Sequence, residues 1–338
     1  MSKKSKRKID LKTAILILLL LAALLFASTY AWFTANRVVS VSDIDVRIEA
    51  QSGLQISADG EHWKSTLTVD DLKTAAYADN SNQLPSTMEP VSTVGEVDTS
   101  TGFMKMFYGT VDSKDNGFAL TATAEPAETA GTTGRFVAFD IFLQVNQDED
   151  NVILGKNSTV TFKGTAGNEG LQNAARVAFI KQTHAAIGAE ASTFVTGHDL
   201  AKSFLEPSQE ATDFWEPNSD VHTAAAVAAA NSNYGIITQQ TEADVIDYYG
   251  INQAITTGVA LGETNDGTDS THFTQVTPSI ITDAAMTDYD NAFSLQEGIT
   301  KIRVYMWIEG QDVDCENNAS GSDITFKLEF KVPETPGA

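Results

Sequence analysis

The sequence predicts an all-β protein: an antiparallel β-sandwich or jelly roll with an irregular, partly helical insertion and an N-terminal hydrophobic leader helix. Several segments alternate apolar and polar residues with a period of two, which is typical of strands with one buried face. Clusters of Gly, Asn and Asp separate these segments, as expected for the turns of an antiparallel sheet. The hydrophobic content of 42% in 338 residues is sufficient for a large core.

The leader is the first element, and residues 1–31 have the order of a secretory signal. A basic run ends at Lys12, an apolar block covers residues 14–26, and small and polar residues lead to Ala31. This block is shorter than the roughly 20 residues that a membrane-spanning helix needs. We expect a signal peptidase to cleave between Ala31 and Trp32, with an uncleaved membrane anchor as the alternative. Either way, the remaining chain is secreted to the cell surface or matrix, and only the leader touches a membrane.

Charge and cysteine content exclude further classes. The net charge is −23, and removal of residues 1–31 changes it to about −28, because that segment carries six basic residues and one acidic residue. Such a surface repels nucleic acid and anionic lipid. The single cysteine, Cys315, excludes an intramolecular disulfide. Nucleic acid is therefore not among the expected partners.

The alternation slips phase near the start of the mature chain. Val39 and Val41 share one parity, whereas Ile44 and Val46 share the other. In one interpretation, a bulge near Ser42 re-aims a single strand of the chain's own sheet. In the other, residues 32–43 form an arm that pairs with another subunit, and the sandwich domain covers residues 44–338. The side chains expected to make the assembly contacts are Trp32, Phe33, Val39 and Val41.

The central and C-terminal strands follow from the same alternation. The alternation predicts two strands, at residues 301–309 and 323–332, and we expect them to be neighbours in one sheet. In the first, Ile302 and Val304 point inward, whereas Lys301 and Arg303 point outward. Further strands are expected at residues 51–57, 103–111, 118–124, 135–145, 159–163 and 175–181.

Residues 185–297 are expected to be an insertion between two strands of the sandwich, because their periodicity is poor. A second small domain is the alternative. Two short helices are predicted here, at residues 224–230 and 242–249. Thr241 and Asp244 are spaced for an N-terminal cap of the second helix, and Gly250 is placed to end it.

The residues do not point to an enzyme. The five histidines are dispersed, and neither a His-Glu-x-x-His motif nor a Gly-x-Ser-x-Gly motif occurs. The like charges of Asp314 and Glu316 disfavour a Cys315 thiolate. No cofactor is expected. The loop at residues 310–318 is either an unliganded acidic hairpin or a structural calcium site, because calcium prefers clustered oxygen ligands. The candidate ligands are Asp312, Asp314, Glu316 and Asn317.

The end of the leader carries a family resemblance. Residues 28–34 read STYAWFT after a basic and then an apolar segment. This pattern resembles the export signals that the signal peptidase SipW processes on TasA-like and camelysin-type surface proteins of Gram-positive bacteria. Residues 137–143 and 303–310 resemble strands of related proteins. The resemblance implies a jelly-roll subunit of extracellular biofilm fibres, in which an N-terminal arm completes the sheet of the next subunit.

The expected function is therefore structural. We expect an exported cell-surface or extracellular-matrix protein that self-associates into fibres, with donor-strand exchange through residues 32–41 as the proposed route. The alternative is a membrane-tethered surface module that binds a ligand or calcium through the insertion and does not polymerise.

Overall fold

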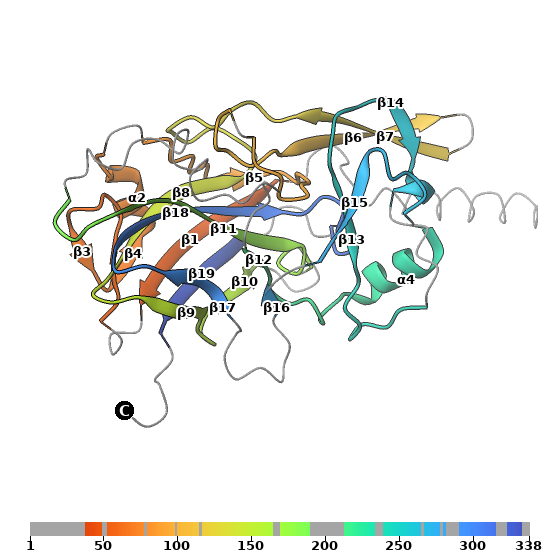
Figure 1. The fold of residues 1–338 in the computed structure, drawn as a ribbon. Coiled ribbons are helices and arrows are strands. Elements are labelled where there is room, and N and C mark those ends of the chain that lie inside the picture. Colours follow the sequence, from red (N-terminus) through yellow and green to blue (C-terminus); the bar gives the residue numbers. More distant parts are fainter. Residues whose placement is uncertain are drawn as a thin grey trace, which may run out of the picture.

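The computed structural model is an all-β sandwich, mostly antiparallel, built around two seven-stranded sheets (Figure 1). The leader and residues 32–37 of the expected arm lie outside the described residues. Among the described residues, no helix has the length and apolar character that crossing a bilayer requires. The structure describes residues 38–48, 53–77, 80–98, 100–114, 117–164, 170–189, 213–233, 239–264, 267–277, 280–281, 291–315 and 323–332.

The first sheet has the order β17-β9-β19-β1-β4, with β10 paired to β19 and β5 paired to β1. A short helix, α2 (Val69–Thr74), follows β4, and Thr68 and Asp71 form a capping box at its start. The strands of this sheet are β1 (Val39–Ile48), β4 (Thr66–Thr68), β5 (Thr87–Met88), β9 (Glu149–Leu154), β10 (Thr159–Lys163), β17 (Asn291–Leu295) and β19 (Asp323–Lys331).

The second sheet has the order β16-β12-β11-β18-β8-β2-β3. Its centre is formed by three long antiparallel strands, β11, β18 and β8. The strands of this sheet are β2 (Gln55–Ser57), β3 (Trp63–Lys64), β8 (Val137–Val145), β11 (Ala175–Ala185), β12 (Asp213–Glu216), β16 (Ile280–Ile281) and β18 (Gly298–Ile308).

The main core lies between these sheets, and it corrects the expected position of the two C-terminal strands. β18 and β19 belong to different sheets, so the prediction that they are neighbours is wrong. Ile302, Val304 and Met306 of β18 enter the same buried cluster as Phe326 and Leu328 of β19. Each strand has an apolar face because it lines this core from one side.

β1 is a single bulged strand of the chain's own sheet. It runs parallel to β19, and its register shifts between Val41 and Asp43. Because of this bulge, Val39 and Ile44 both reach the main core despite their different parity. This arrangement agrees with the first interpretation of the phase slip. The strand therefore runs through the expected boundary at Ile44, and Val39 and Val41 lie inside the sandwich.

The outer face of β18 is covered as well, although the alternation predicted a solvated face. Lys301, Arg303, Tyr305 and Glu309 are at most 2% exposed. A third layer of irregular chain, within residues 82–107, packs here through bridges such as Val91 to Glu309. Val91, Met104 and Met106 share a second core with Tyr305 and Trp307. β18 is thus buried on both faces.

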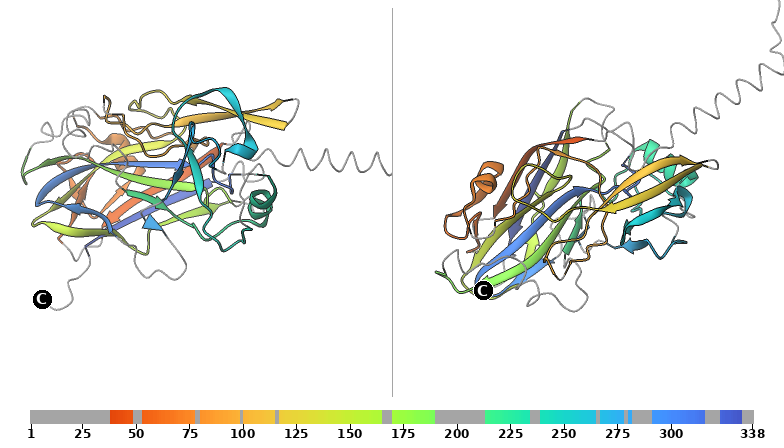
Figure 2. Two further views of the ribbon diagram at one scale, coloured as in Figure 1. Left: turned by 45° about the vertical axis from the view of Figure 1, so that its right-hand side comes forward. Right: turned by 90° about the horizontal axis from the view of Figure 1, so that it is seen from above.

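A smaller unit at one end of the sandwich joins the described elements between residues 224 and 276 of the insertion to a hairpin from outside it (Figure 2). The hairpin and one strand of the insertion make a three-stranded sheet, β14-β7-β6. Strands β12, β16 and β17, also from residues 185–297, join the main sheets instead. The elements of this unit are β6 (Phe107–Lys114), β7 (Gly117–Ala124), α4 (Ala224–Asn233), β13 (Tyr248–Ile251), β14 (Ile255–Ala260), η2 (Leu261–Glu263) and β15 (Phe273–Val276).

One of the two predicted helices is present. α4 occupies the first predicted position, but residues 242–249 form a turn followed by β13. Thr241 and Asp244 make the expected contact, in which the Thr241 amide donates to Asp244 Oδ2 at 2.7 Å. The chain then becomes extended because Tyr248 and Tyr249 pair with β15. The predicted contact between Thr241 and Asp244 is therefore present, but it stabilises a turn instead of the start of a helix.

Candidate functional site

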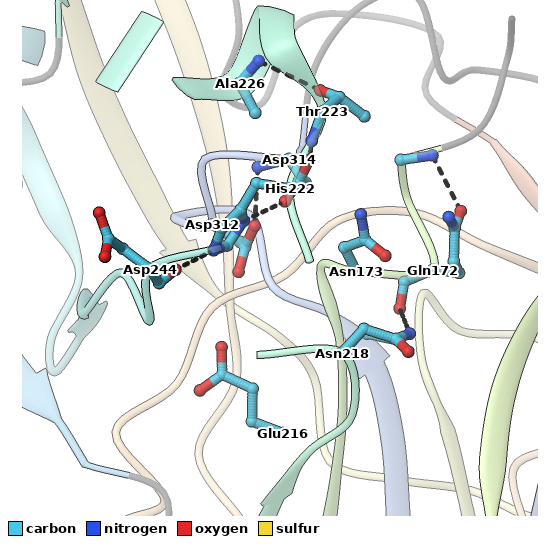
Figure 3. A network of polar contacts seen from close by, with 12 residues as sticks. Gln172, Asn173, Glu216, Asn218, His222, Thr223, Ala226, Asp244, Asp312 and Asp314 are labelled. Carbon is cyan, nitrogen blue, oxygen red and sulfur yellow. Dashed lines mark hydrogen bonds and ion pairs between the residues drawn. The ribbon is translucent and has the colours of Figure 1, made fainter. Parts of the chain in front are cut away.

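The loop that follows β18 is the centre of a buried polar network (Figure 3). Asp312 and Asp314, two of the four predicted calcium ligands, are 2% and 1% exposed. Asp312 Oδ1 accepts a hydrogen bond from the Asp314 amide at 2.7 Å. The other two predicted ligands, Glu316 and Asn317, lie outside the described residues. The two described carboxylates of the loop therefore point into the protein.

Arg176 of β11 is the cation that meets Asp312. Its Nη2 atom lies 2.5 Å from Asp312 Oδ2 and 2.5 Å from Glu216 Oε1. Its Nη1 atom donates to two backbone carbonyls, and the ring of Tyr248 lies 5.0 Å from the guanidinium carbon. Burial opposes the charge, but the two carboxylates outweigh it and raise the pKa of Arg176. This guanidinium is held permanently positive.

His222 is the cation that meets Asp314. Its Nδ1 atom lies 2.6 Å from Asp314 Oδ2, and its Nε2 atom lies 2.9 Å from the Asp244 carbonyl oxygen. Both ring nitrogens face acceptors, so the geometry favours the doubly protonated imidazolium. Burial lowers the pKa of His222, but the bond to Asp314 and the nearby Asp312 outweigh it, so the pKa is raised.

The same carboxylate reaches the start of α4. The Thr223 amide donates to Asp314 Oδ1 at 2.9 Å, and Thr223 Oγ1 accepts from the Ala226 amide at 3.1 Å. Thr223 thus caps the helix and contacts the loop at once. A continuous series of contacts therefore runs from β11 through Asp312 and Asp314 to the smaller unit.

Two carboxyl groups in this region, one of them the Arg176 partner Glu216, titrate near neutral pH. Burial raises the pKa of Glu216 to about 7, although Arg176 opposes the shift. Burial also raises the pKa of Glu309 to about 7. Glu309 accepts hydrogen bonds from Trp307 Nε1 and from the Gln311 amide, each at 3.0 Å. The network can exchange protons in the physiological range.

The charged groups of this network interact with other groups of the protein. Within the described ranges, no three His, Cys, Asp or Glu side chains are arranged to hold a metal ion. Cys315 is buried in the main core, with 0% exposure. A nucleophile there would not meet a substrate without opening the sandwich. The carboxylate oxygens of Asp312 and Asp314 bind protein cations and backbone amides, which makes the network a connection between structural units.

A second network, absent from the sequence expectations, lies on the outer face of β18. Arg303 Nη1 lies 2.9 Å from Asp140 Oδ1, and its Nε donates to Glu128 Oε2 at 2.8 Å. Lys301 Nζ lies 3.0 Å from Asp140 Oδ2, which also accepts from the Tyr77 hydroxyl at 2.7 Å. Burial alone would raise the pKa of Asp140, but Lys301 and Arg303 lower it to about 2.

The fold and these sites define an all-β sandwich whose layers are joined by buried ion networks. Comparison with protein-family models, with curated proteins and with solved structures gave no match.

Proposed function

We propose that this chain is an exported, non-enzymatic structural protein of the cell surface or extracellular matrix, a jelly-roll subunit of biofilm-type fibres. The leader pattern in residues 1–31 supports export. The resemblance of residues 28–34 to SipW-processed signals supports a Gram-positive surface or matrix location. A sandwich that uses its described polar clusters for internal contacts is suited to a scaffold.

The observation that carries the proposal is the place of β1 in its sheet. β1 comes from the start of the mature chain, yet it lies between β19 on one side and β4 and β5 on the other. Val39 and Val46 are fully buried in the main core. An identical strand from a neighbouring copy can fill the same place with the same contacts. If every copy donates its strand to the next, the assembly is an open filament.

A paired-cysteine variant tests strand donation directly. Ser42 Oγ of β1 and Thr325 Oγ1 of β19 lie 3.0 Å apart, so Ser42→Cys with Thr325→Cys places two thiols within bonding reach. Electron microscopy establishes whether the secreted protein forms filaments. Oxidised filaments that give a ladder of covalent multimers on denaturing gels support donation. Filaments that give only cross-linked monomer, or an absence of filaments, contradict it.

Truncation provides a second test. A variant that starts at Trp32 is expected to polymerise, whereas one that starts at Ile44 is expected to stay folded and monomeric. Circular dichroism shows whether the shorter chain remains folded, since it loses the backbone bond from Val41 to Ser86. Continued polymerisation of the shorter chain would contradict a role for residues 32–43.

The alternative function is a membrane-tethered module that binds a ligand or calcium; the cavity beside β6 is a candidate ligand site, although its lining lies outside the 185–297 insertion. The mass of the intact cell-associated protein separates the two functions. Retention of residues 1–31 favours the tether, whereas their loss favours a released subunit.

A further inference from the structure

A cavity of about 250 Å³ lies at the base of the β6–β7 hairpin, between the third layer and the smaller unit. It is larger than the roughly 150 Å³ cavity that accepts a benzene molecule in an apolar core. A ring with a short substituent fits this volume. The cavity is lined by Asp98, Thr101, Phe103, Met104, Lys105, Met106, Phe107, Ala124, Glu125, Pro126, Ala127, Glu128 and Phe136.

The lining favours an organic group over a hydrated ion. Phe103, Phe107 and Phe136 contribute aromatic rings, and Met104 and Met106 contribute thioethers. Rings and thioethers attract apolar and cationic groups but bind hydrated metal ions poorly. The ring of Phe103 already interacts with a cation, because the Arg303 guanidinium lies 5.1 Å from the ring centre.

The charges around the cavity leave a negative excess. Arg135 is shared by two carboxylates, Glu125 in the lining and Glu89 outside it. Lys105 is paired with Glu96, so its charge is already balanced. Asp98 accepts hydrogen bonds from Ser100 but forms no ion pair with the described residues. An anion would therefore be repelled, whereas a cation would be attracted.

Glu125 is the group placed to receive that cation. Its side chain is only 6% exposed, and Oε1 accepts from Arg135 Nη1 at 2.8 Å. Its second carboxylate oxygen receives no hydrogen bond from the described part of the chain. A carboxylate oxygen with spare acceptor capacity, in a side chain that is mostly buried, gains free energy when a charged N–H group reaches it.

We propose that this cavity binds a small organic cation, with an ammonium group donating to Glu125 and an apolar body against the rings of Phe103 and Phe136. The site is independent of the fibre function. It requires neither strand donation nor release from the membrane, so either can fail without affecting it.

Three probes of similar shape and different charge test the chemistry. The secreted protein is titrated with benzylammonium, benzyl alcohol and benzoate at pH 7, and the methyl signals of Met104 and Met106 are followed by NMR. Saturable shifts with benzylammonium, at least about tenfold weaker with benzyl alcohol and absent with benzoate, support the proposal. No saturable binding of benzylammonium, or equal binding of benzyl alcohol, overturns it.

Matched variants locate the site. Glu125→Gln is expected to weaken benzylammonium binding about tenfold, whereas Glu89→Gln removes the same charge from the other partner of Arg135 and is expected to change it less than about twofold. Ala127→Phe at the exposed edge of the cavity is expected to block binding. Ala130→Phe, equally exposed and outside the lining, is expected to leave it unchanged. Equal effects within either pair would overturn the assignment.

Discussion

His222 Nδ1 and Asp314 Oδ2 lie 2.6 Å apart, in side chains that are 2% and 0% exposed. This contact joins the segment before α4 to the loop after β18, two regions 92 residues apart in the chain. The pair holds the smaller unit against the sandwich. Because its strength depends on the imidazolium, the connection between the two units depends on pH.

We expect the free energy of unfolding to fall as pH rises from about 5 to 8. Glu216 and Glu309 have folded pKa values of about 7, raised from 4.5, and the pKa of His222 is raised above 6.5. All three groups bind more protons when folded than when unfolded in this window, so raising the pH favours unfolding. Urea unfolding should show a loss of at least about 2 kcal/mol between these pH values.

The double variant Glu216→Gln, Glu309→Gln should reduce this dependence between pH 5 and 7, because two of the three titrating groups are removed and only His222 remains. Equal or greater stability of the natural chain at pH 8 would contradict the prediction. Carboxyl groups with lowered pKa values titrate below this window and do not disturb the test. These are Asp59, Asp71, Asp98, Asp140 and Asp269.

His222→Gln isolates the imidazolium. We expect a loss of about 2 kcal/mol at pH 6, since a neutral amide replaces a buried charge-assisted bond, and a smaller loss at pH 9. Hydrogen exchange should accelerate first in α4. His62→Gln is the control, because His62 makes a similar contact with Asp59, at 2.7 Å, from a side chain that is 77% exposed. Equal destabilisation by both variants would show that burial of the pair has no role.

The main sandwich could be predicted from the sequence because strands lining a single core keep one parity. Alternation placed β8, β10, β18 and β19 correctly. The two-residue strands β3, β5 and β16 have no detectable period and were missed. The alternation also does not show which strands share a sheet. β18 and β19 would have similar patterns whether they lay side by side in one sheet or faced each other across the core. Tyr248 and Tyr249 became a strand only through pairing with β15.

The polar networks were not predictable from local spacing. An alternating strand predicts one polar face, but the pattern does not distinguish water from a third layer of chain. Arg303 and Lys301 were therefore assigned to solvent. One signal was present: in the strand VAFDIFLQV, Asp140 lies in the middle of a run of apolar residues from Val137 to Leu143, which indicates a buried partner. The partners of Arg176 are 40 and 136 residues away in the chain, so no motif connects them.

The acidic loop is expected to be insensitive to calcium. Asp312 and Asp314 already bind Arg176 and His222, so calcium would have to displace these cations. Thermal unfolding should give the same midpoint in EDTA and in millimolar calcium chloride. A midpoint that rises with calcium, and no longer does so in Glu316→Gln, would establish the loop as a calcium site. Glu316→Gln keeps the carboxylates of Asp312 and Asp314, which form the two ion pairs in the described part of the loop.

Gly250 is required for a close approach between β13 and the third layer. A Cβ atom at this position would collide with the carbonyl oxygen of Thr93. Gly250→Ala is expected to destabilise the protein by about 2 kcal/mol, because backbone has to move. Gly262→Ala is the control, since a Cβ atom there meets nothing within 4 Å. Chemical unfolding that gives similar free energies for both variants would contradict this account.

Arg303→Met tests the buried network of β18 against a surface ion pair. The change leaves Glu128 and Asp140 buried beside an apolar side chain, and the expected loss is about 3–5 kcal/mol. Arg47→Met breaks the 2.7 Å pair with Glu329, but Arg47 is 42% exposed, and the expected loss is below about 1 kcal/mol. Adding Glu128→Gln to Arg303→Met should restore part of the stability, because the unpaired charge of Glu128 disappears, whereas Asp140 keeps its partner Lys301. Urea unfolding measures all of these variants. If the added substitution deepens the loss, the cost comes from lost packing of the Arg303 side chain instead of from unpaired charge.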